Sequence, residues 1–171
     1  MKKKLCAALF ALLLLTAGIA QAAAPLTAAD FELTYAGAAY TLGADPAALL
    51  AAMTARDGAA PEVIEADSCI FTGKDKEFYG AELVLGTYPT GKNGGDQLET
   101  IVITAVDIPT ARGVGVGSAR DQVTAAYGPG LEDYDTLLYA IHTPYESPTL
   151  IFQFDLDSDT VVAVMLMACS A

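Results

Sequence analysis

The sequence predicts an α+β fold in which two α-β-β-β units follow one another in tandem, with the helices packed on one face of an antiparallel sheet. Three observations predict it. Short apolar runs alternate with Gly, Pro and Asp turns, as they do in antiparallel strands. Two segments carry helix start and stop signals. The same order of elements recurs 74 residues further along the chain.

Residues 1–22 have the composition of a secretory signal peptide. Three lysines, Lys2 to Lys4, precede an uncharged apolar run, and Ala20-Gln21-Ala22 supplies the small residues that signal peptidase recognises. We expect cleavage after this segment, and an uncleaved membrane anchor is the alternative. The rest divides into a first unit with an N-terminal hairpin, residues 23–109, and a second unit, residues 110–171.

The first unit opens with a β-hairpin. Residues 31–35 and 39–42 alternate in polarity on either side of Ala36-Gly37, which predicts a two-residue turn. Asp45-Pro46 then starts a helix, because Asp accepts a hydrogen bond from a free backbone amide and Pro fits the first helical position. Gly58 ends this helix. Three strands are predicted after it, at residues 68–72, 78–88 and 98–105.

The second unit repeats this plan. Ser118 is predicted to cap the helix, with Asp121 in the capping-box position three residues later. Gly128-Pro129-Gly130 ends the helix. Three strands follow, at residues 136–141, 148–155 and 160–168. The last strand is apolar on both faces, which predicts a central strand or one in an interface.

An offset of 74 residues brings the two units into register. This agreement favours an internal duplication, and a single undivided α+β domain is the alternative. The matched positions are Tyr40 with Val114, Leu42 with Val116, Gly43 with Gly117, Leu49 with Val123, and Met53 with Tyr127.

Cleavage of the signal peptide leaves a strongly acidic chain. It removes three of the nine Lys and Arg residues and none of the 21 Asp and Glu residues, so six bases remain against 21 acids, a net charge of −15. Such a surface is repelled by nucleic acid and by anionic lipid, and we expect neither as a partner. No segment after residue 22 has the length and hydropathy expected of a transmembrane helix.

Two cysteines remain after cleavage, Cys69 and Cys169. An even number in an exported chain favours a disulfide, which would close a loop of about 100 residues and contribute at most about 4–5 kcal/mol in the chain-entropy model. Two buried thiols that never meet are the alternative. One cysteine pair and the single histidine, His142, fall short of a structural metal set, and we expect no metal and no cofactor.

Two stretches carry a resemblance to known proteins. With the opening hairpin they resemble a group of uncharacterised exported proteins of anaerobic Firmicutes, over nearly the whole mature chain. That resemblance implies no activity, and relatives often have Asn-Gly where this chain has Ala36-Gly37. The stretches are Ser68-Cys69-Ile70-Phe71-Thr72-Gly73-Lys74-Asp75-Lys76 through Tyr79-Gly80 to Thr87-Tyr88-Pro89, and Thr110-Ala111-Arg112-Gly113-Val114-Gly115-Val116-Gly117-Ser118 through Val123 to Tyr127-Gly128.

The predicted unit also looks like a known repeat at the level of fold. Its order of Gly turn, helix and three strands is similar to the repeats of β-lactamase-inhibitor proteins and of small outer-membrane-assembly lipoproteins. This likeness implies a binding module rather than an enzyme. It carries over no contact residue, because no motif for one is present, and likeness of fold alone does not establish a function.

Three motifs are better explained by turns than by ligands. The glycines of Gly113–Ser118 have neither dinucleotide-loop nor phosphate-loop spacing, so we expect a strand-turn-helix joint. Asp155, Asp157 and Asp159 alternate as calcium ligands do, but Thr160 stands where a calcium loop needs Gly, and a hairpin turn suits the same residues. His142 is predicted to lie at a strand end.

The tyrosines are the candidate binding residues. Exposed tyrosines gathered on a sheet face would form a binding surface, because each ring contributes contact area and a hydroxyl at low entropic cost. The alternative is that they alternate into the core, since Tyr is common in strands. The candidates fall in or beside predicted strands and are Tyr79, Tyr88, Tyr134, Tyr139 and Tyr145.

No nucleophile motif or carboxylate spacing singles out a catalytic centre. We therefore predict a secreted or envelope-associated, acidic, non-catalytic binding or interaction module. The sequence does not identify its ligand; another extracellular protein is the candidate partner, and inhibition of a secreted enzyme is a narrower version. The alternatives are a small secreted hydrolase that uses Asp and Glu carboxylates and a structural component of the cell envelope.

Overall fold

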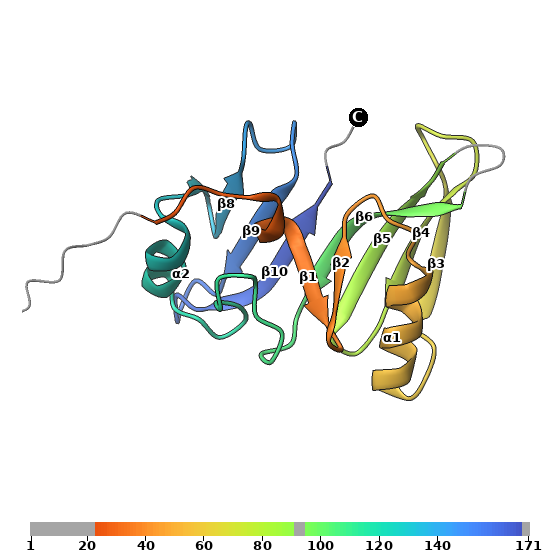
Figure 1. The fold of residues 1–171 in the computed structure, drawn as a ribbon, viewed down its shortest axis with the longest axis horizontal. Coiled ribbons are helices and arrows are strands. Elements are labelled where there is room, and N and C mark those ends of the chain that lie inside the picture. The colour runs from red at the N-terminus through yellow and green to blue at the C-terminus, as the bar shows by residue number, and fades with distance from the viewer. Residues whose placement is uncertain (1–22, 91–94, 169–171) are drawn as a thin grey trace, which may run out of the picture.

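The computed structural model describes residues 23–90 and 95–168, so the predicted signal peptide and Cys169 lie outside the described residues. The described chain is mixed, with two α-helices and mostly antiparallel sheet (Figure 1), which confirms the α+β class. Neither helix in these two ranges is long and apolar enough to cross a membrane. The elements are η1 (Ala28–Phe31), β1 (Glu32–Tyr35), β2 (Ala38–Thr41), α1 (Ala47–Asp57), β3 (Glu62–Asp67), β4 (Lys74–Tyr79), β5 (Leu83–Pro89), β6 (Asp96–Ile103), α2 (Arg120–Tyr127), β7 (Leu131–Asp133), β8 (Thr136–Ala140), β9 (Thr149–Phe154) and β10 (Val161–Met167).

Eight strands form one sheet in the order β3-β4-β5-β6-β10-β9-β8-β7, and β1 and β2 form a separate hairpin. Four strands follow each helix, whereas the sequence predicted three. The strands after α1 make up one half of the sheet and those after α2 the other. The halves join where β6 pairs with β10, with Ile103 opposite Val164. β10 is therefore an interior strand, as its apolar pattern predicted.

The first half of the sheet departs from the sequence prediction. Residues 68–72 are the tip of the hairpin between β3 and β4, not a strand, and residues 78–88 are divided between β4 and β5 by a turn at Gly80. β3 itself was missed, because all six of its side chains are exposed and it shows no alternation. In the second half, by contrast, β8, β9 and β10 confirm the predicted strands to within one residue at each end.

The two helices begin in different ways. Asp45 Oδ1 accepts the Ala47 N–H at 2.8 Å, and α1 ends at Gly58 with a φ of 73°, both as predicted. The predicted Ser118–Asp121 capping box is wrong. Gln122 Oε1 accepts the Ala119 N–H at 2.8 Å, one residue later, while the Ser118 hydroxyl accepts the N–H of Gly115 inside the preceding turn.

The turns before the two helices make equivalent hydrogen bonds to the sheet. Each turn contains a glycine with a positive φ, 78° at Gly43 and 86° at Gly117, which an L side chain adopts only with strain. Each turn is thereby fixed to one of the two strands at the middle of the sheet, β6 or β10. The bonds run from Gly43 N–H to Leu98 O and from Leu98 N–H to Ala44 O at 2.8 and 2.9 Å, and from Gly117 N–H to Val161 O and from Val161 N–H to Ser118 O, both at 2.8 Å.

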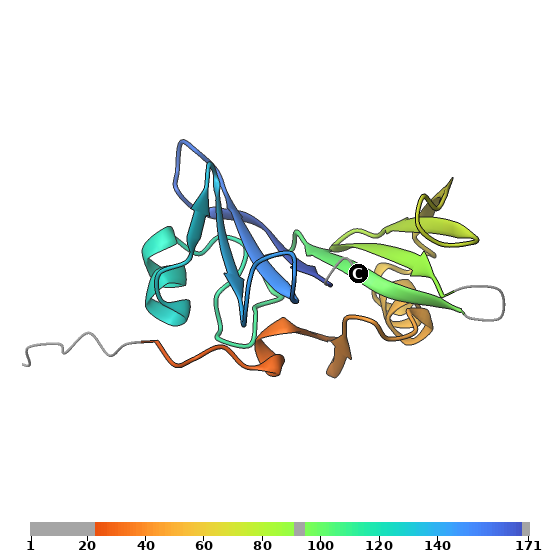
Figure 2. The same ribbon diagram turned by 90° about the horizontal axis from the view of Figure 1, so that it is seen from above.

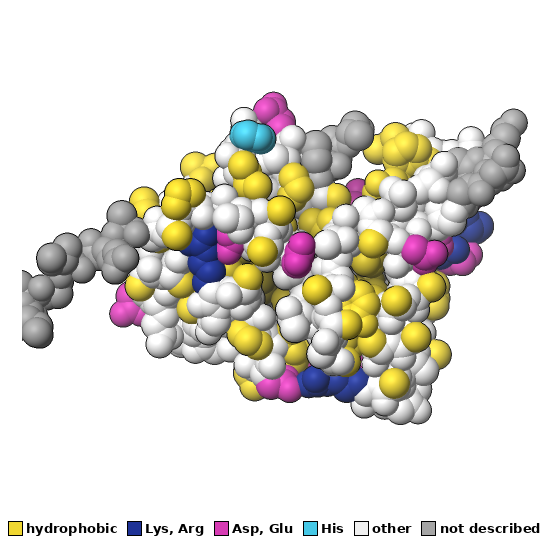
Figure 3. Space-filling view, viewed as in Figure 1, with side chains coloured by type: hydrophobic (Ala, Val, Ile, Leu, Met, Phe, Trp, Pro, Cys, Tyr) yellow, Lys and Arg dark blue, Asp and Glu magenta, His cyan; other side chains and the backbone are white. Residues whose placement is uncertain are grey.

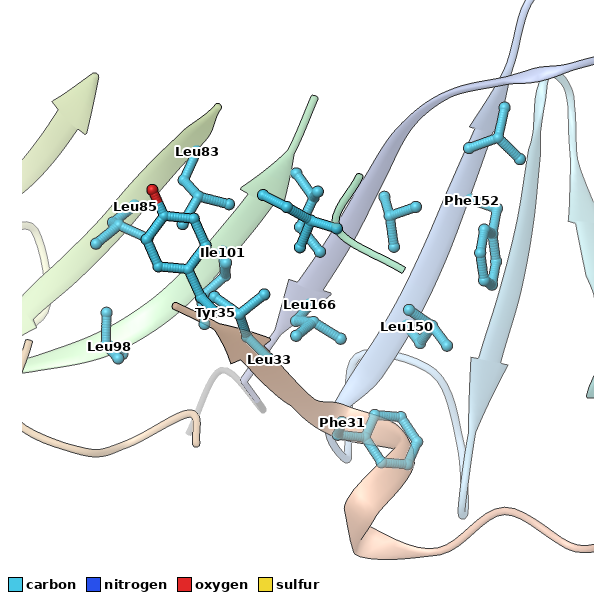
Figure 4. Packing of buried hydrophobic residues seen from close by; sticks show 14 of the residues in the cluster. Phe31, Leu33, Tyr35, Leu83, Leu85, Leu98, Ile101, Leu150, Phe152 and Leu166 are labelled. Carbon is cyan, nitrogen blue, oxygen red and sulfur yellow. The ribbon is translucent and has the colours of Figure 1, made fainter. Parts of the chain in front are cut away.

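One hydrophobic cluster joins both helices, η1, the hairpin and the six inner strands of the large sheet, and the two edge strands, β3 and β7, contribute nothing to it. Leu49 and Met53 of α1 and Val123 and Tyr127 of α2 belong to it, together with alternate residues of the strands. The hairpin of β1 and β2 lies to one side of the large sheet (Figure 2). Phe31 of η1 and two side chains of β1 run across both halves of the sheet (Figure 4). Phe31 points toward Leu150, Leu33 toward Leu166, and Tyr35 toward Leu83 and Leu85.

Arg112 fastens the N-terminal segment to the second half of the chain. Its guanidinium donates to both oxygens of Asp30, from Nε at 2.7 Å and from Nη2 at 2.9 Å. It also donates to the backbone carbonyls of Ala24 at 2.8 Å and of Pro25 at 3.0 Å. The guanidinium lies over the Tyr127 ring, 4.7 Å from its centre. Residues 24–31 are thereby held in one position on the fold.

Candidate functional site

A groove of about 350 Å³ lies on the sheet face opposite the hydrophobic cluster. Side chains alternate between the two faces of a strand, so Val164 and Leu166 of β10 enter the cluster while Ala163 and Met165 line the groove. The sequence prediction did not name these residues, but its observation that β10 is apolar on both faces was the signal for them. The remaining lining residues are Val102, Ile151, Gln153 and Thr136 on the strands, and Asp133, Tyr134, Asp135 and Tyr145 at the rim.

Two of the five predicted tyrosines meet at this groove. Tyr134 stands in the turn between β7 and β8 and Tyr145 in the loop between β8 and β9, and their side chains are 84% and 49% exposed. Both residues have a positive φ, 53° and 67°. That conformation costs a non-Gly residue about 1–2 kcal/mol, and strain of this kind gathers at functional sites. We name this surface the tyrosine groove.

The backbone beneath both tyrosines is fixed by hydrogen bonds. The Tyr145 N–H donates to Thr149 Oγ1 at 3.0 Å, and the Ser147 hydroxyl donates to Thr143 O at 3.1 Å within the same loop. Beside Tyr134, the Asp135 carbonyl accepts the Phe154 N–H of β9 at 2.8 Å. The rings therefore stand on ordered backbone, which lowers the entropy lost when a ligand binds.

The rim of the tyrosine groove is acidic. Asp133 and Asp135 flank Tyr134, and Asp135 Oδ2 accepts a hydrogen bond from Gln153 Nε2 at 3.2 Å. In the described part of the chain, each Lys and Arg forms an ion pair elsewhere, so none neutralises these two carboxylates. On the face drawn in Figure 3, basic side chains likewise lie beside acidic ones.

The other three predicted tyrosines lie elsewhere. Tyr139 is buried in the cluster, where its hydroxyl donates to Gly128 O at 3.0 Å and burial raises its pKa to about 12. Tyr88 of β5 is half-buried under the Phe71 ring. Tyr79 of β4 is 40% exposed and bonds to Glu77 on its own strand. Tyr139 therefore follows the alternative prediction, in which a strand tyrosine points into the core.

Cys69 is exposed at the tip of the hairpin between β3 and β4. This tip folds toward β5, since the Phe71 ring stacks on the Tyr88 ring with 5.2 Å between centres. Tyr88 pairs with Gln97, near the start of β6. The loop that carries Cys69 therefore lies close to that end of β6.

The end of the described chain lies along the same strand. The Ala168 N–H donates to Glu99 O of β6 at 2.7 Å. Cys169 is the next residue and lies outside the described part. The predicted Cys69–Cys169 disulfide therefore stays a prediction.

The aspartates predicted to form a hairpin turn do so. Asp155 Oδ1 accepts the backbone N–H groups of Asp157 and Ser158 between β9 and β10, at 3.1 and 2.8 Å. Asp159 pairs with Arg120. Among residues 23–90 and 95–168, no group of three His, Cys, Asp or Glu side chains is placed to hold a metal ion. His142 is exposed in the loop after β8.

No family model, no curated protein and no solved structure matches this chain.

Proposed function

We propose that the protein is an exported, non-catalytic binding module that takes a segment of another extracellular protein into the tyrosine groove. One observation carries this proposal: Tyr134 and Tyr145 reach the same groove from two turns, and both hold a strained backbone there. Asn or Gly would occupy either position with less strain. Contacts made by the rings with a partner would explain why tyrosine stands in both turns.

The charge of the module favours a basic partner. Asp133 and Asp135 border the groove, and the chain after residue 22 carries a net charge of −15. Complementary charge raises the rate of encounter and selects among partners. The hydrolase alternative has less support, because the two carboxylates that line the groove, Asp133 and Asp135, stand on either side of a single residue, Tyr134, and no observation assigns them acid and base roles.

We also infer that the two halves are repeats of one unit and that both helices cover the face of the sheet that carries the hydrophobic cluster. The equivalent hydrogen bonds at Gly43 and Gly117 support the repeat, as does the mirrored strand order. The buried residues of both helices join one cluster, which supports a shared face. On this proposal the unit has four strands, and the long β3–β4 hairpin accounts for the greater length of the first.

The proposed binding site can be tested with a displayed library of random peptides. The library is panned against the wild-type protein, and enriched peptides are then measured against the double variant Tyr134→Ala/Tyr145→Ala. We expect at least about a tenfold weaker affinity for the variant, the loss typical of two aromatic contacts. Chemical shifts of the two tyrosine rings should move when peptide is added.

Tyr79→Ala is the control, because Tyr79 is 40% exposed, close to the 49% of Tyr145, but stands on β4 outside the groove. It should leave peptide affinity unchanged. The proposal fails if no peptide is enriched, or if the enriched peptides bind all three proteins equally well.

A further inference from the structure

A second surface, separate from the tyrosine groove, lies at the outer edge of the large sheet. β3 is the first strand in the sheet order and pairs only with β4. All six of its side chains are exposed, including Val63 at 46% and Ile64 at 52%. An edge strand presents unpaired N–H and C=O groups along its free side, where another strand can add.

An apolar groove of about 270 Å³ lies beside this edge, between α1 and β3. Leu50, Ala51 and Thr54 of α1 form one wall, and Val63 and Phe78 of the strands form the other. Figure 1 shows α1 alongside this end of the sheet. A strand laid along β3 would direct every second side chain toward α1. A free strand edge beside a helix is an arrangement that binds peptides by β-strand addition.

The charge of β3 restricts what can add to it. Glu62, Glu65 and Asp67 are its charged residues, and all three are acidic. Lys74 Nζ lies 3.9 Å from both Glu65 and Asp67, while Glu62 has no ion pair among the described residues. Opposite charges on adjacent strands stabilise a sheet, so a strand with Lys or Arg fits this edge.

The β3 strand of a second copy of the chain does not fit this edge. If β3 paired with itself about its centre in antiparallel register, Glu62 would stand opposite Asp67, and Ile64 opposite Glu65. Like charges directly opposite are destabilising. The same acids that disfavour self-pairing leave the edge open to a basic strand.

We propose that β3 and α1 take up an extended basic segment of another polypeptide. The segment adds a strand beside β3, places apolar side chains in the groove against α1, and sets Lys or Arg against the acids of β3. This surface goes beyond the proposed tyrosine groove and shares no residue with it, so each can be lost without the other.

A charge-reversed form of the protein itself is the sharpest probe. In Glu62→Lys/Glu65→Lys/Asp67→Lys the edge becomes basic, and the variant alone should stay monomeric by the same repulsion. We expect the variant to form a heterodimer when it is mixed with the wild type at about 0.5 mM of each, a concentration at which millimolar affinities are detectable. Sedimentation should then show a species of twice the monomer mass. Backbone amides of β3 should gain protection from hydrogen exchange. Ala51→Trp in the wild-type partner fills the groove and should weaken this association about tenfold.

The matched control reverses three exposed acids elsewhere, Asp121→Lys/Glu146→Lys/Asp157→Lys, with the same change in net charge. Its mixture with the wild type should stay monomeric. A second probe, the peptide Lys-Val-Lys-Val-Lys-Val, requires no variant and should protect the amides of β3, whereas Glu-Val-Glu-Val-Glu-Val should not. The proposal is overturned if the first mixture stays monomeric, if the control mixture associates as strongly, or if the basic peptide protects amides away from β3.

Discussion

Gly43 and Gly117 donate equivalent hydrogen bonds, each to a carbonyl of a strand at the middle of the sheet, Leu98 on β6 and Val161 on β10. Both have a positive φ, and open space surrounds the position of an added Cβ at either glycine. A side chain at position 43 or 117 would therefore destabilise the fold through backbone strain alone, without a steric clash.

We expect Gly43→Ala and Gly117→Ala to lower the free energy of unfolding by similar amounts, about 1 kcal/mol each, because Ala adopts a left-handed backbone with strain. Urea denaturation checks this. Gly95→Ala is the control, since Gly95 also faces open space but has no positive φ. Strongly unequal losses at Gly43 and Gly117 would count against the proposed repeat.

The ion pair between Arg112 and Asp30 predicts a pH-dependent stability. The Arg112 guanidinium holds the pKa of the Asp30 carboxyl below its ordinary value. The contribution of this pair is therefore present above the unfolded pKa, about 3.9, and is lost as the pH falls through the lower folded pKa. We expect Asp30→Asn to lower the free energy of unfolding by about 3 kcal/mol at pH 7, because it leaves Arg112 partly buried without a counter-charge.

Urea denaturation at pH 7 and at about pH 2.5 measures this difference, which should shrink at the lower pH. Asp107→Asn removes the more exposed partner of Arg56 and should change stability by less than about 1 kcal/mol. Equal losses for the two variants, or a loss at Asp30 that does not depend on pH, would contradict the prediction.

Glu99 predicts the opposite dependence on pH. Burial, and then the charge of Asp75, raises the pKa of Glu99, while Asp75 Oδ1 is itself buried without a hydrogen-bond partner among the described residues. A raised folded pKa means that the folded state binds the proton more tightly, so stability falls as pH rises from the ordinary value, about 4.3, through the folded pKa. Glu99→Gln should remove this fall. If wild type and variant lose stability in parallel over this window, Glu99 is not the group responsible.

Tyr134→Asn should make the protein more stable while it weakens binding. The Tyr134 ring is largely exposed, so its loss removes little packing, and Asn tolerates a positive φ better than Tyr does. We expect a gain of about 0.5 kcal/mol in the free energy of unfolding. Thermal or urea unfolding, run beside the peptide affinities described above, measures both quantities. A destabilised variant would mean that the ring stabilises the isolated fold instead of serving a partner.

The intact mass of the protein secreted by a native-like host tests export and the disulfide together. We expect a chain that starts near Ala23, lacks two hydrogens, and takes up no alkylating reagent without reductant. A Cys69–Cys169 bond forms when the two thiols pass two protons and two electrons to an external disulfide. A mass that retains residues 1–22 would refute cleavage, and two alkylated cysteines would refute the bond.

The two halves of the sheet differed in how far the sequence predicted them. β8, β9 and β10 could be predicted because each combines an apolar run with clear turn residues, such as Asp157-Ser158. β3 could not, since an edge strand with both faces exposed has no period. The apolar residues Cys69-Ile70-Phe71 were predicted as a strand, but they form a hairpin tip whose Phe71 packs on the distant Tyr88.

The tyrosine groove was predictable only in part. Aromatic composition singled out Tyr134 and Tyr145 together with three others. Their meeting depends on two turns and on the pairing of β8 with β9, a tertiary relationship that no local pattern encodes. Tyr139 is buried because it pairs with Leu150 on the cluster side of that ladder.

The contacts of Arg112 also set an order of events in time. A ribosome makes residues 24–31 before anything else in the described chain, yet their partner follows more than 80 residues later. Until then residues 24–31 lack the hydrogen bonds that Arg112 donates in the folded protein. We therefore expect residues 24–31 to be among the last of the described residues to reach their native position, because the contacts that hold them come from the second half of the chain.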